Sequence, residues 1–307
     1  MIKVCLFFKE MGPAGGVETF EYYLGKHFLN DNELEFEFWA LKWDDEQFKL
    51  MSTVGKCVKW EGQKIICDVF IFASRDVRLI LNYVEAKKII EVFHMASNLG
   101  WNTLTDPRVT NYISVSKAGA DVFERASGKK CDVYYPIIEL DKNKYDHTKY
   151  NDGKLHLISC SRLDTADKGA RRMKYIADVL DKLNIDYEWT IYGIIADYLN
   201  NKGINFKGKT LDKDTLFNEI SRNDFFVQLS DAEGFGISIS EALHLDVPII
   251  STPISVLNEH LVNDNNCIVC NFDCSNIVDV INKMMKKDDY KFNYIGQNSD
   301  WKSLLLN

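Results

Sequence analysis

Short apolar runs alternate with amphipathic stretches along nearly the whole chain. Apolar runs of strand length joined by segments with helical periodicity predict βαβ units and parallel sheets. The polar stretch 139–153, ELDKNKYDHTKYNDG, has no apolar period and is the expected linker between two such halves. Strands are expected at 2–8, 34–43, 54–60, 67–73, 88–94, 111–115, 154–160, 187–193, 225–229 and 247–251. Helices are expected from 17 onward, at 75–86, at 116–126 with Ser116 as N-cap, from 169 onward, before 206, at 211–222 and at 236–245.

Length and charge restrict the classes of protein to consider. The 307 residues suggest two domains of about 150 residues each, which we place at 1–145 and 146–290. The net charge of −8 argues against nucleic acid as a partner, since phosphate binding needs a basic surface. The start MIKVCLFFKE is too short and too soon interrupted by charge to be a signal peptide, and no apolar run reaches membrane-spanning length. We therefore expect a cytoplasmic protein.

The eight cysteines lie mostly in apolar runs, as small buried hydrophobic residues do. Cys267, Cys270 and Cys274 form one cluster, but no second cysteine or histidine pair follows at metal spacing. Inert thiols are favoured there over a zinc site. The adjacent pairs at 44–45 and 288–289 are not D-x-D, so a metal-bridged diphosphate is not indicated. No metal and no cofactor are expected.

The stretch 225–254 reads as strand, loop, helix and strand, and its loop holds two acids and two glycines. Glu233 and Glu241 stand eight positions apart where a parallel sheet places its ligands. Carboxylates accept hydrogen bonds from vicinal hydroxyls of a sugar or ribose, and Gly234 and Gly236 let backbone N–H groups approach a phosphate. The alternative is structural: Ser238 and Glu241 would form a capping box, and Glu233 would be a solvated loop acid.

Two further loops have the pattern of anion sites. Gly15 and Gly16 lie between the first strand and a helix, an arrangement that cradles phosphate but is also common in ordinary turns. Arg162 and Lys168 follow the strand 154–160, and two cations there would stabilise a leaving diphosphate. The alternative is a solvated loop in which Arg162 pairs with Asp164 or Asp167.

His94 is expected at the carboxyl end of the strand 88–94, where a side chain can reach substrate. Spacing alone favours a structural histidine at this position. Asn98 and Trp101 follow in the next loop, where they line an acceptor site or only close the loop.

The segment 233–255, EGFGISISEALHLDVPIISTPIS, resembles the E-x7-E segment of the retaining glycosyltransferases of family 4. Those enzymes have the GT-B fold, which implies two Rossmann-like α/β domains facing across a cleft. The glycine loop resembles the family's GGVE loop, and 161–169 resembles its G-R-L…K-G motif with Ser161 in place of glycine. The tail 291–307 resembles the terminal helix that crosses back to the first domain.

The resemblance implies a role for each matching residue, and His94 occupies the position of a family histidine near the transferred sugar, although Met95 replaces the usual aspartate. His94 and Glu233 are the expected catalytic residues, His94 by hydrogen-bonding the sugar or orienting the acceptor. The implied donor-phosphate residues are Gly15, Gly16, Arg162 and Lys168. The implied sugar and ribose residues are Glu233, Gly234, Phe235, Gly236 and Glu241. The implied base-binding residues are Tyr192, Gly193, Lys209 and Thr210, and the implied acceptor-side residues are Glu18, Asn98 and Trp101.

The resemblance implies a metal-independent hexosyltransferase that moves a sugar from a nucleoside-diphosphate sugar to an acceptor hydroxyl with retention. UDP-sugar is favoured and GDP-sugar stays open, since the base loop is reduced to GIIAD at 193–197. The implied acceptor is a carbohydrate or a lipid-linked molecule in cell-surface polysaccharide or glycolipid synthesis, with peripheral contact at the inner membrane face. Two alternatives remain: a GT-B sugar-nucleotide epimerase, and a catalytically inactive partner subunit.

Overall fold

The structure is a computed structural model that describes residues 1–12, 15–73, 75–95, 105–260, 262–290, 294 and 296–307. The chain forms two compact units. Unit 1 comprises Met1–Glu139 and Gln297–Asn307, and unit 2 comprises Leu140–Gly296. Among the described residues, no helix is long and apolar enough to cross a membrane.

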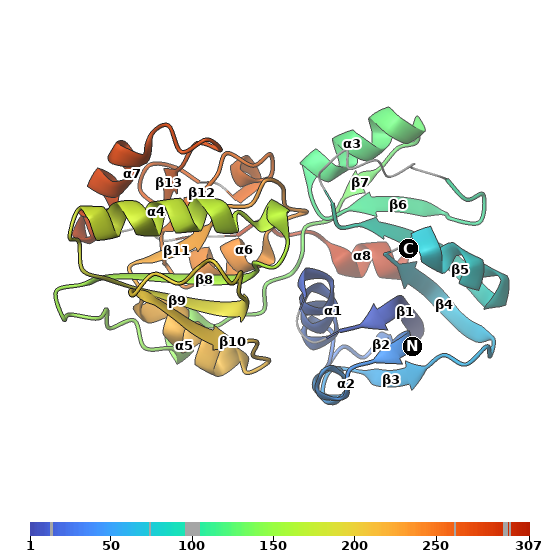
Figure 1. The fold of residues 1–307 in the computed structure, drawn as a ribbon. Helices are drawn as coiled ribbons and strands as arrows, with labels where there is room; N and C mark the ends of the chain where they lie inside the picture. The colour runs from blue at the N-terminus through green and yellow to red at the C-terminus, as the bar shows by residue number, and fades with distance from the viewer. Residues whose placement is uncertain (13–14, 74, 96–104, 261, 291–293, 295) are drawn as a thin grey trace. The chain divides into compact units, whose positions relative to one another are not determined.

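Unit 1 is built on a parallel sheet whose seven described strands run in the order β3-β2-β1-β4-β5-β6-β7 (Figure 1). Neighbouring strands are parallel throughout, as in the pairing of Val4 with Val69. Their bounds are Ile2–Met11 (β1), Leu34–Trp43 (β2), Lys56–Lys59 (β3), Ile65–Phe72 (β4), Val84–Phe93 (β5), Asn111–Ser114 (β6) and Asp132–Val133 (β7).

Helices cover both faces of this sheet. On one face, the 3-10 helix η1 (Arg75–Tyr83) packs Val77 and Ile80 against Phe7 and Phe70. On the other, Phe20 of α1 (Gly16–His27) lies 5.4 Å, ring to ring, from Trp301 of α8. The described helices of the unit are completed by α2 (Asp45–Met51), α3 (Lys117–Ser127) and α8 (Trp301–Leu306).

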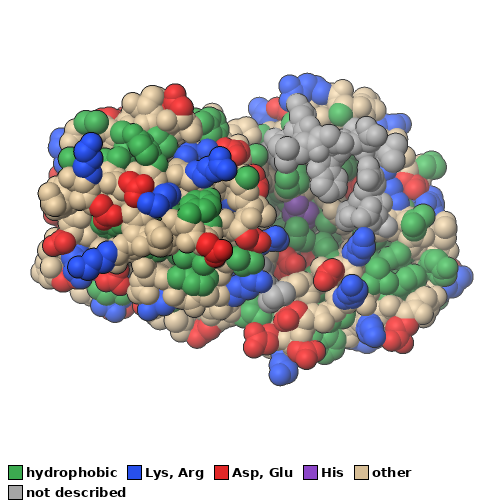
Figure 2. All heavy atoms as spheres, viewed as in Figure 1, with side chains coloured by type: hydrophobic (Ala, Val, Ile, Leu, Met, Phe, Trp, Pro, Cys, Tyr) green, Lys and Arg blue, Asp and Glu red, His purple; other side chains and the backbone are tan. Residues whose placement is uncertain are grey.

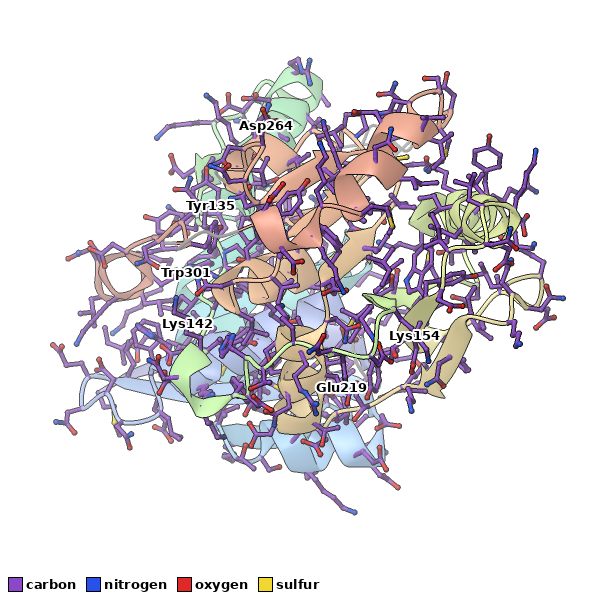
Figure 3. All side chains as sticks on the ribbon, turned by 90° about the vertical axis from the view of Figure 1, so that its left-hand side faces the viewer. Tyr135, Lys142, Lys154, Glu219, Asp264 and Trp301 are labelled. Atoms are coloured by element: carbon purple, nitrogen blue, oxygen red, sulfur yellow. The ribbon has the colours of Figure 1, made fainter. Side chains whose placement is uncertain are left out.

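The returning segment 297–307 is fastened to unit 1 by polar contacts as well as packing. The indole Nε1 of Trp301 donates to the carbonyl of Tyr135 at 2.8 Å (Figure 3). Lys302 pairs with Asp31, and Lys88 donates to the carbonyl of Leu304. Because Trp301 is 1% exposed, this segment supplies part of the core of unit 1.

Unit 2 repeats the same plan with a parallel sheet of six described strands in the order β10-β9-β8-β11-β12-β13. In strand order, both sheets follow the 3-2-1-4-5-6 pattern of Rossmann folds. The bounds are Leu155–Arg162 (β8), Tyr187–Ile194 (β9), Ile204–Gly208 (β10), Phe225–Gln228 (β11), Ile249–Ser251 (β12) and Cys267–Val269 (β13).

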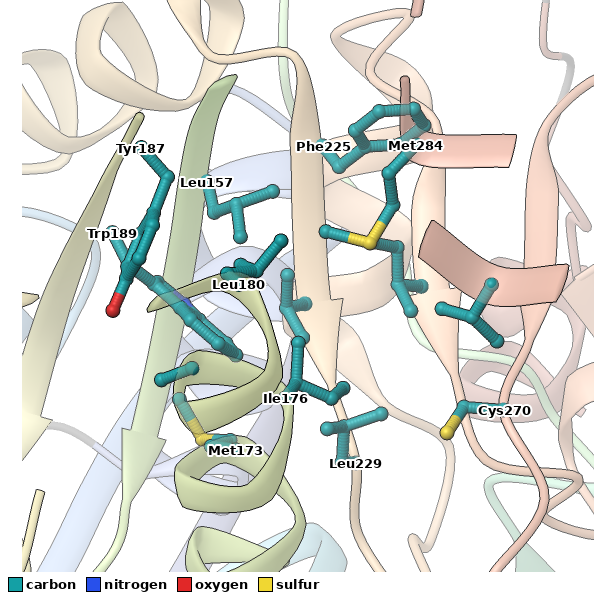
Figure 4. Packing of buried hydrophobic residues seen from close by; sticks show 14 of the residues in the cluster. Leu157, Met173, Ile176, Leu180, Tyr187, Trp189, Phe225, Leu229, Cys270 and Met284 are labelled. Atoms are coloured by element: carbon teal, nitrogen blue, oxygen red, sulfur yellow. The ribbon is translucent and has the colours of Figure 1, made fainter. Parts of the chain in front are cut away.

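The main core of unit 2 lies between this sheet and two helices, α4 (Ala170–Lys182) and α7 (Ile277–Met284). Figure 4 shows Met173, Ile176 and Leu180 of α4 pointing at sheet residues that include Leu157 and Trp189. The helices α5 (Lys213–Arg222) and α6 (Ile237–His244) pack beside each other, and α6 contacts β11 and β12. Short 3-10 helices lie at Lys142–Lys144 (η2), Ala166–Lys168 (η3), Leu257–His260 (η4) and Lys287–Asp289 (η5).

The sequence predicted most of these elements, and Ser116 caps α3 as expected by accepting from Gly119 N. Two helix predictions were wrong. The helix expected at 75–86 is a 3-10 helix that ends at Tyr83, and β5 begins directly at Val84. The helix expected before 206 is absent from the described residues 195–203, which form turns and irregular structure between β9 and β10. The helix α2 was not predicted.

The boundaries expected after 145 and after 290 both fall inside unit 2. Residues just after 139 are already tied to unit 2 by ion pairs. Lys142 pairs with Asp246, and Lys144 pairs with Asp214 at 2.8 Å.

Candidate functional site in unit 2 and polar residues of unit 1

The sheet of unit 2 reverses its winding between β8 and β11. Strands on the two sides of such a switch point send their following loops in opposite directions, which opens a crevice for ligands at the carboxyl edge. The loop after β8 contains Lys168, and the loop after β11 contains Glu233. The structure therefore brings two of the predicted site residues to this edge from different parts of the chain.

The two loops are joined through backbone contacts. The N–H of Asp231 donates to the carbonyl of Asp167 at 2.7 Å. Gly169 has a φ of +75°, and a Cβ placed on it would lie 1.8 Å from the carbonyl oxygen of Leu229. Only glycine fits this close approach, so Gly169 fixes where α4 begins relative to β11.

Arg172 of α4, which the sequence analysis did not single out, is a second residue that connects α4 to the loop after β11. Its Nε donates to the carbonyl of Leu229 at 3.0 Å, and its Nη2 pairs with the carboxylate of Asp231. The guanidinium also lies 5.6 Å from the ring centroid of Phe272. Because one planar group contacts both backbone and carboxylate, the start of the Glu233 loop is held in one position.

Glu233 lies at the centre of a compact hydrogen-bond network. Its Oε1 accepts from Lys168 Nζ at 2.8 Å, from Ser230 Oγ at 2.7 Å and from Gln228 Nε2 at 2.9 Å. The side chain of Glu233 is only 15% exposed. The predicted alternative of a solvated loop acid is therefore wrong, since most of this side chain is shielded from solvent and its carboxylate is paired.

Arg162 ends β8 with a side chain that is 60% exposed. Its Nε lies 3.7 Å from a carboxylate oxygen of Asp164, which is a long contact for an ion pair. The predicted alternative, in which Arg162 pairs with Asp164 in a solvated loop, is thus present as a weak ion pair. An exposed guanidinium at the end of the strand can still turn toward an anion at the same edge.

Glu241 is buried in α6, and its Oε1 pairs with Lys213 Nζ at 2.9 Å. The capping box expected from Ser238 and Glu241 is not formed, because α6 begins at Ile237 with Gly236 as N-cap and no side-chain cap. Gly236 has a φ of +81°, which favours glycine. The carbonyl of the preceding residue, Phe235, accepts a hydrogen bond from Nε2 of His260.

The residues predicted to bind a base lie at the carboxyl ends of β9 and β10. Tyr192 pairs across the ladder with Cys160 on one side and with Gly208 on the other, and Gly193 pairs with Ser161. Gly193 has a φ of +126°, and a Cβ there would lie 2.0 Å from the carbonyl oxygen of Ser161. The next residues after β10 are Lys209, which is exposed, and Thr210, whose Oγ1 accepts from Asp212 N. The structure thus places these four residues on the same edge of the sheet as Arg162.

In unit 1, Gly15 is the N-cap of α1 and Gly16 is its first residue. The carboxylate of Glu18 folds back over this loop, where its Oε1 accepts from Gly12 N at 3.3 Å. A Cβ on Gly15 would lie 2.2 Å from Glu18 Oε2. The first turn of α1 therefore already has a carboxylate at its positive end, which is the kind of charge that a helix N-terminus favours.

His94 directly follows β5, as predicted, and its ring lies 4.9 Å from that of Phe20. Its Nε2 is buried and has no hydrogen-bond partner among the described residues. Burial lowers the pKa of His94 to about 4, so the ring is neutral at pH 7. The predicted residues Asn98 and Trp101 lie outside the described residues.

Sequence reasoning also missed Glu21 of α1, which is fully buried. Neither of its carboxylate oxygens has a partner among the described residues, and burial raises the pKa of this carboxyl well above its usual range. A single acid within an amphipathic helix pattern does not indicate from the sequence that its side chain will be buried. Burial also raises the pKa of the Cys267 and Cys270 thiols to about 12.

Acidic and basic side chains are interspersed over the face of the molecule shown in Figure 2. Among the described residues, no three His, Cys, Asp or Glu side chains group closely enough to hold a metal ion.

Comparison with known protein families and curated sequences adds independent findings. The sequence model of the family described as "Glycosyl transferases group 1" matches residues 142–300, more than half of the chain. A "Putative glycosyltransferase 48" of Sulfolobus islandicus filamentous virus is 24% identical over 120 residues. That alignment covers 38% of this chain and 37% of the viral protein, so the chain spans little more than a third of that relative.

Solved structures resemble nearly the whole chain. TarM matches with a TM-score of 0.71 and 10% identity, covering 94% of this chain and 92% of its own. The Anabaena protein HepE, in complex with UDP-glucose, matches with a TM-score of 0.71, 15% identity and the same coverage. The lipopolysaccharide outer core galactosyltransferase WaaB matches with a TM-score of 0.63 and 15% identity, covering 95% and 92%. At these identities the likeness concerns the fold, and it confirms the predicted pair of Rossmann-like domains of GT-B glycosyltransferases.

Proposed function

The chain belongs to the glycosyl transferases group 1 family, and we propose that it transfers a sugar from a nucleoside-diphosphate sugar to an acceptor hydroxyl with retention. The observation that carries this proposal is the meeting of Lys168 and Glu233 at the switch point of unit 2, with Nζ and Oε1 2.8 Å apart. A cation for the leaving phosphate and a carboxylate for the sugar hydroxyls are there held side by side on joined loops.

The leaving group gains negative charge as its bond to the sugar breaks. Lys168 and Arg162 are the proposed cations that stabilise this charge, and fixed charges of this kind favour the transition state over the ground state. Arg162 is exposed at the end of β8 and can approach a diphosphate without losing a strong partner. In unit 1, the proposed phosphate contacts are the backbone N–H groups of Gly15 and Gly16 at the start of α1.

The hydroxyls of the donor are the proposed ligands of the two glutamates. Glu233 binds the transferred sugar, with Gly234, Phe235 and Gly236 lining the same loop. Glu241 binds the ribose, and its pairing with Lys213 fixes the position of the buried carboxylate. Tyr192, Gly193, Lys209 and Thr210 are the proposed contacts of the base, which sits beyond the ribose on the same edge.

The proposed chemistry is front-side attack, in which an oxygen of the donor phosphate takes the proton of the acceptor hydroxyl. Glu233 is anchored by Lys168, Ser230 and Gln228, and so it acts by binding rather than by forming a bond to the sugar. The neutral ring of His94 hydrogen-bonds or orients a hydroxyl and does not act as the nucleophile. Glu18, Asn98 and Trp101 are proposed on the acceptor side.

UDP-sugar is the proposed donor, and GDP-sugar is the second choice. HepE, which shares the fold, is described in complex with UDP-glucose. The proposed enzyme is a metal-independent hexosyltransferase whose acceptor is a carbohydrate or a lipid-linked molecule. Cell-surface polysaccharide or glycolipid synthesis is the proposed setting, since WaaB is a galactosyltransferase of the lipopolysaccharide outer core. A cytoplasmic location with peripheral membrane contact remains a prediction.

Slow hydrolysis of donors tests this proposal without knowledge of the acceptor. Purified protein is incubated with a panel of UDP- and GDP-sugars, and release of UDP or GDP is measured together with the thermal shift that each nucleotide causes. Lys168→Ala is expected to lower release by about 100-fold or more, because it removes a charge that stabilises the leaving group. Lys174→Ala is the matched control, since Lys174 lies in the next helix, α4, and its ion pair among the described residues is with the exposed Asp178.

Turnover that survives Lys168→Ala in a folded protein would remove Lys168 from the site. If the wild type releases no nucleotide and no nucleotide raises its melting temperature, the inactive partner subunit becomes the better interpretation. Interconversion of the donor sugar without release of its nucleotide would favour the epimerase.

A further inference from the structure

Gln228 is a buried amide at the centre of the proposed sugar site to which neither motif nor family match gives a role. It is the last residue of β11 and is 4% exposed. Its Nε2 donates both to Ser230 Oγ at 2.7 Å and to Glu233 Oε1 at 2.9 Å. Ser230 in turn donates to the same oxygen of Glu233. Gln228 therefore supports Glu233 directly and through Ser230.

The orientation of the amide follows from its neighbours. Ser230 Oγ donates its only proton to Glu233, so it can accept from an NH₂ group but cannot donate to an amide oxygen. A reversed amide would also point its oxygen at a carboxylate. The NH₂ group therefore faces Glu233, and the amide Oε1 is left buried with no partner among the described residues. A buried acceptor without a partner costs stability that an apolar side chain of similar size would not.

The three donors share one oxygen of the carboxylate. Lys168, Ser230 and Gln228 all contact Oε1, within 2.7 to 2.9 Å. A carboxylate held at one oxygen by donors from three directions cannot exchange its two oxygens by rotation without breaking all three bonds. The geometry thus distinguishes the oxygens: Oε1 belongs to the protein, and Oε2 is left for another partner.

We propose that Gln228 is a positioning residue that dedicates Oε1 of Glu233 to the protein and leaves Oε2 as the acceptor for a donor-sugar hydroxyl. This inference rests on the proposed role of Glu233 in sugar binding. It concerns recognition of the sugar, because the hydrogen bonds of Gln228 go to Ser230 and Glu233 and not to the proposed phosphate cations Lys168 and Arg162. A nucleoside diphosphate without its sugar should therefore bind equally well whether or not Gln228 is present.

Gln228→Met tests the inference, because methionine keeps the length of the side chain and removes both polar atoms. The matched control is Gln47→Met in unit 1, where a buried glutamine also has an amide oxygen without a described partner. Affinities are measured for the nucleoside diphosphate and for the donor sugar nucleotide that the wild type hydrolyses fastest. Gln228→Met should weaken donor binding by about tenfold, or lower kcat/KM for nucleotide release by the same factor. This is the effect expected from the loss of one hydrogen bond to a charged group. The affinity of Gln228→Met for the nucleoside diphosphate should stay unchanged. Gln47→Met should bind both the nucleoside diphosphate and the donor sugar nucleotide as the wild type does.

Two further variants keep the test decisive if Gln228→Met folds poorly. Ser230→Ala removes a parallel donor to Oε1 and should reproduce the sugar-specific loss. Gln228→Glu places a second carboxylate beside Glu233, so one of the pair should hold a proton to a higher pH. The acid limb of the pH–rate profile should then move upward, which a packing role for residue 228 would not cause.

The outcomes separate the inference from the proposed function. Equal loss of donor and nucleoside-diphosphate binding in Gln228→Met would make Gln228 a packing residue and overturn the positioning role. No loss in Gln228→Met, with a large loss in Glu233→Gln, would overturn the role of Gln228 and leave the function standing. No loss in either variant would remove Glu233 from the sugar site, and no donor release by the wild type would overturn both proposals.

Discussion

At the scale of single residues, each unit contains a histidine whose ring carries no charge at neutral pH. Burial lowers the pKa of both His94 and His260 to about 4. His260 donates from Nε2 to the carbonyl of Phe235, and its Nδ1 has no partner among the described residues. A neutral donor of this kind holds the backbone beside the glycines of the Glu233 loop without adding charge to it.

Stability should therefore fall as the pH is lowered from about 6.5 to 4. In the unfolded chain each histidine has a pKa of about 6.5, so the unfolded state binds more protons in this window and protonation favours it. For the fully buried His260, a shift from about 6.5 to about 4 corresponds to about 3 kcal/mol. Well above pH 6.5 the histidines are neutral in both states and cause no pH dependence.

His260→Gln isolates one of these contributions, because glutamine keeps a donor near the position of Nε2 but does not titrate. We expect the free energy of unfolding of this variant to fall less steeply between pH 6.5 and 4 than that of the wild type. Urea unfolding at pH 7, 6, 5 and 4.5 measures the difference. Parallel curves for the two proteins would show that His260 is not buried in its neutral form.

At the scale of elements, the site of unit 2 depends on where β8, β11 and α4 end or begin. Gly169 and Arg172 at the start of α4 both contact Leu229, which follows β11. The loop that holds Lys168 and the loop that holds Glu233 are thus positioned together. A change at this junction should alter both halves of the proposed donor site.

Gly169→Ala is expected to destabilise unit 2 by about 3 kcal/mol or more. The φ of +75° strains any other residue, and the new Cβ would collide with a backbone oxygen that cannot move without separating α4 from β11. Gly153→Ala is the control, because Gly153 has a φ of +83° but open space around its Cβ position. It should cost about 1 kcal/mol from strain alone. Chemical denaturation of both variants measures the difference, and equal losses would rule out the steric contact.

Sequence periodicity predicted the strands well because both sheets are parallel and buried on two faces, which makes each strand a short apolar run. It failed at α2, whose seven residues are too few to define a period, and it did not distinguish the 3-10 helix η1 from an α-helix. The family resemblance made Lys168 and Glu233 candidates. It could not identify Gln228, Lys213 or Arg172, since each becomes relevant only through a partner that the fold brings from elsewhere in the chain.

At the scale of the whole molecule, each unit has its own sheet and its own core. The chain leaves unit 1 after Glu139 and returns to it at Gln297. The returning segment buries Trp301 between Phe20 and Tyr134, at ring distances of 5.4 and 5.3 Å. Unit 1 is therefore discontinuous in sequence, and unit 2 is continuous.

Trp301→Ala should destabilise unit 1 by about 3 to 5 kcal/mol, the usual cost of removing a buried tryptophan. Unit 2 should keep its stability because its core contains no residue of the returning segment. Trp189→Ala is the reciprocal variant, since Trp189 is fully buried in unit 2. Hydrogen exchange, followed by peptide across 1–139 and 140–296, measures each unit separately. Loss of protection across both units in either variant would contradict two independent cores.

The split of unit 1 sets an order of events on the ribosome. Domains that are continuous in sequence can fold as they emerge, first to last. Here the first 139 residues emerge early but lack Trp301 until translation has passed through all of unit 2. Unit 2 is made second but can finish folding first, because unit 1 cannot complete its core until residues 297–307 have been made. A nascent chain stalled before residue 297 should contain a native second half attached to an incomplete first one.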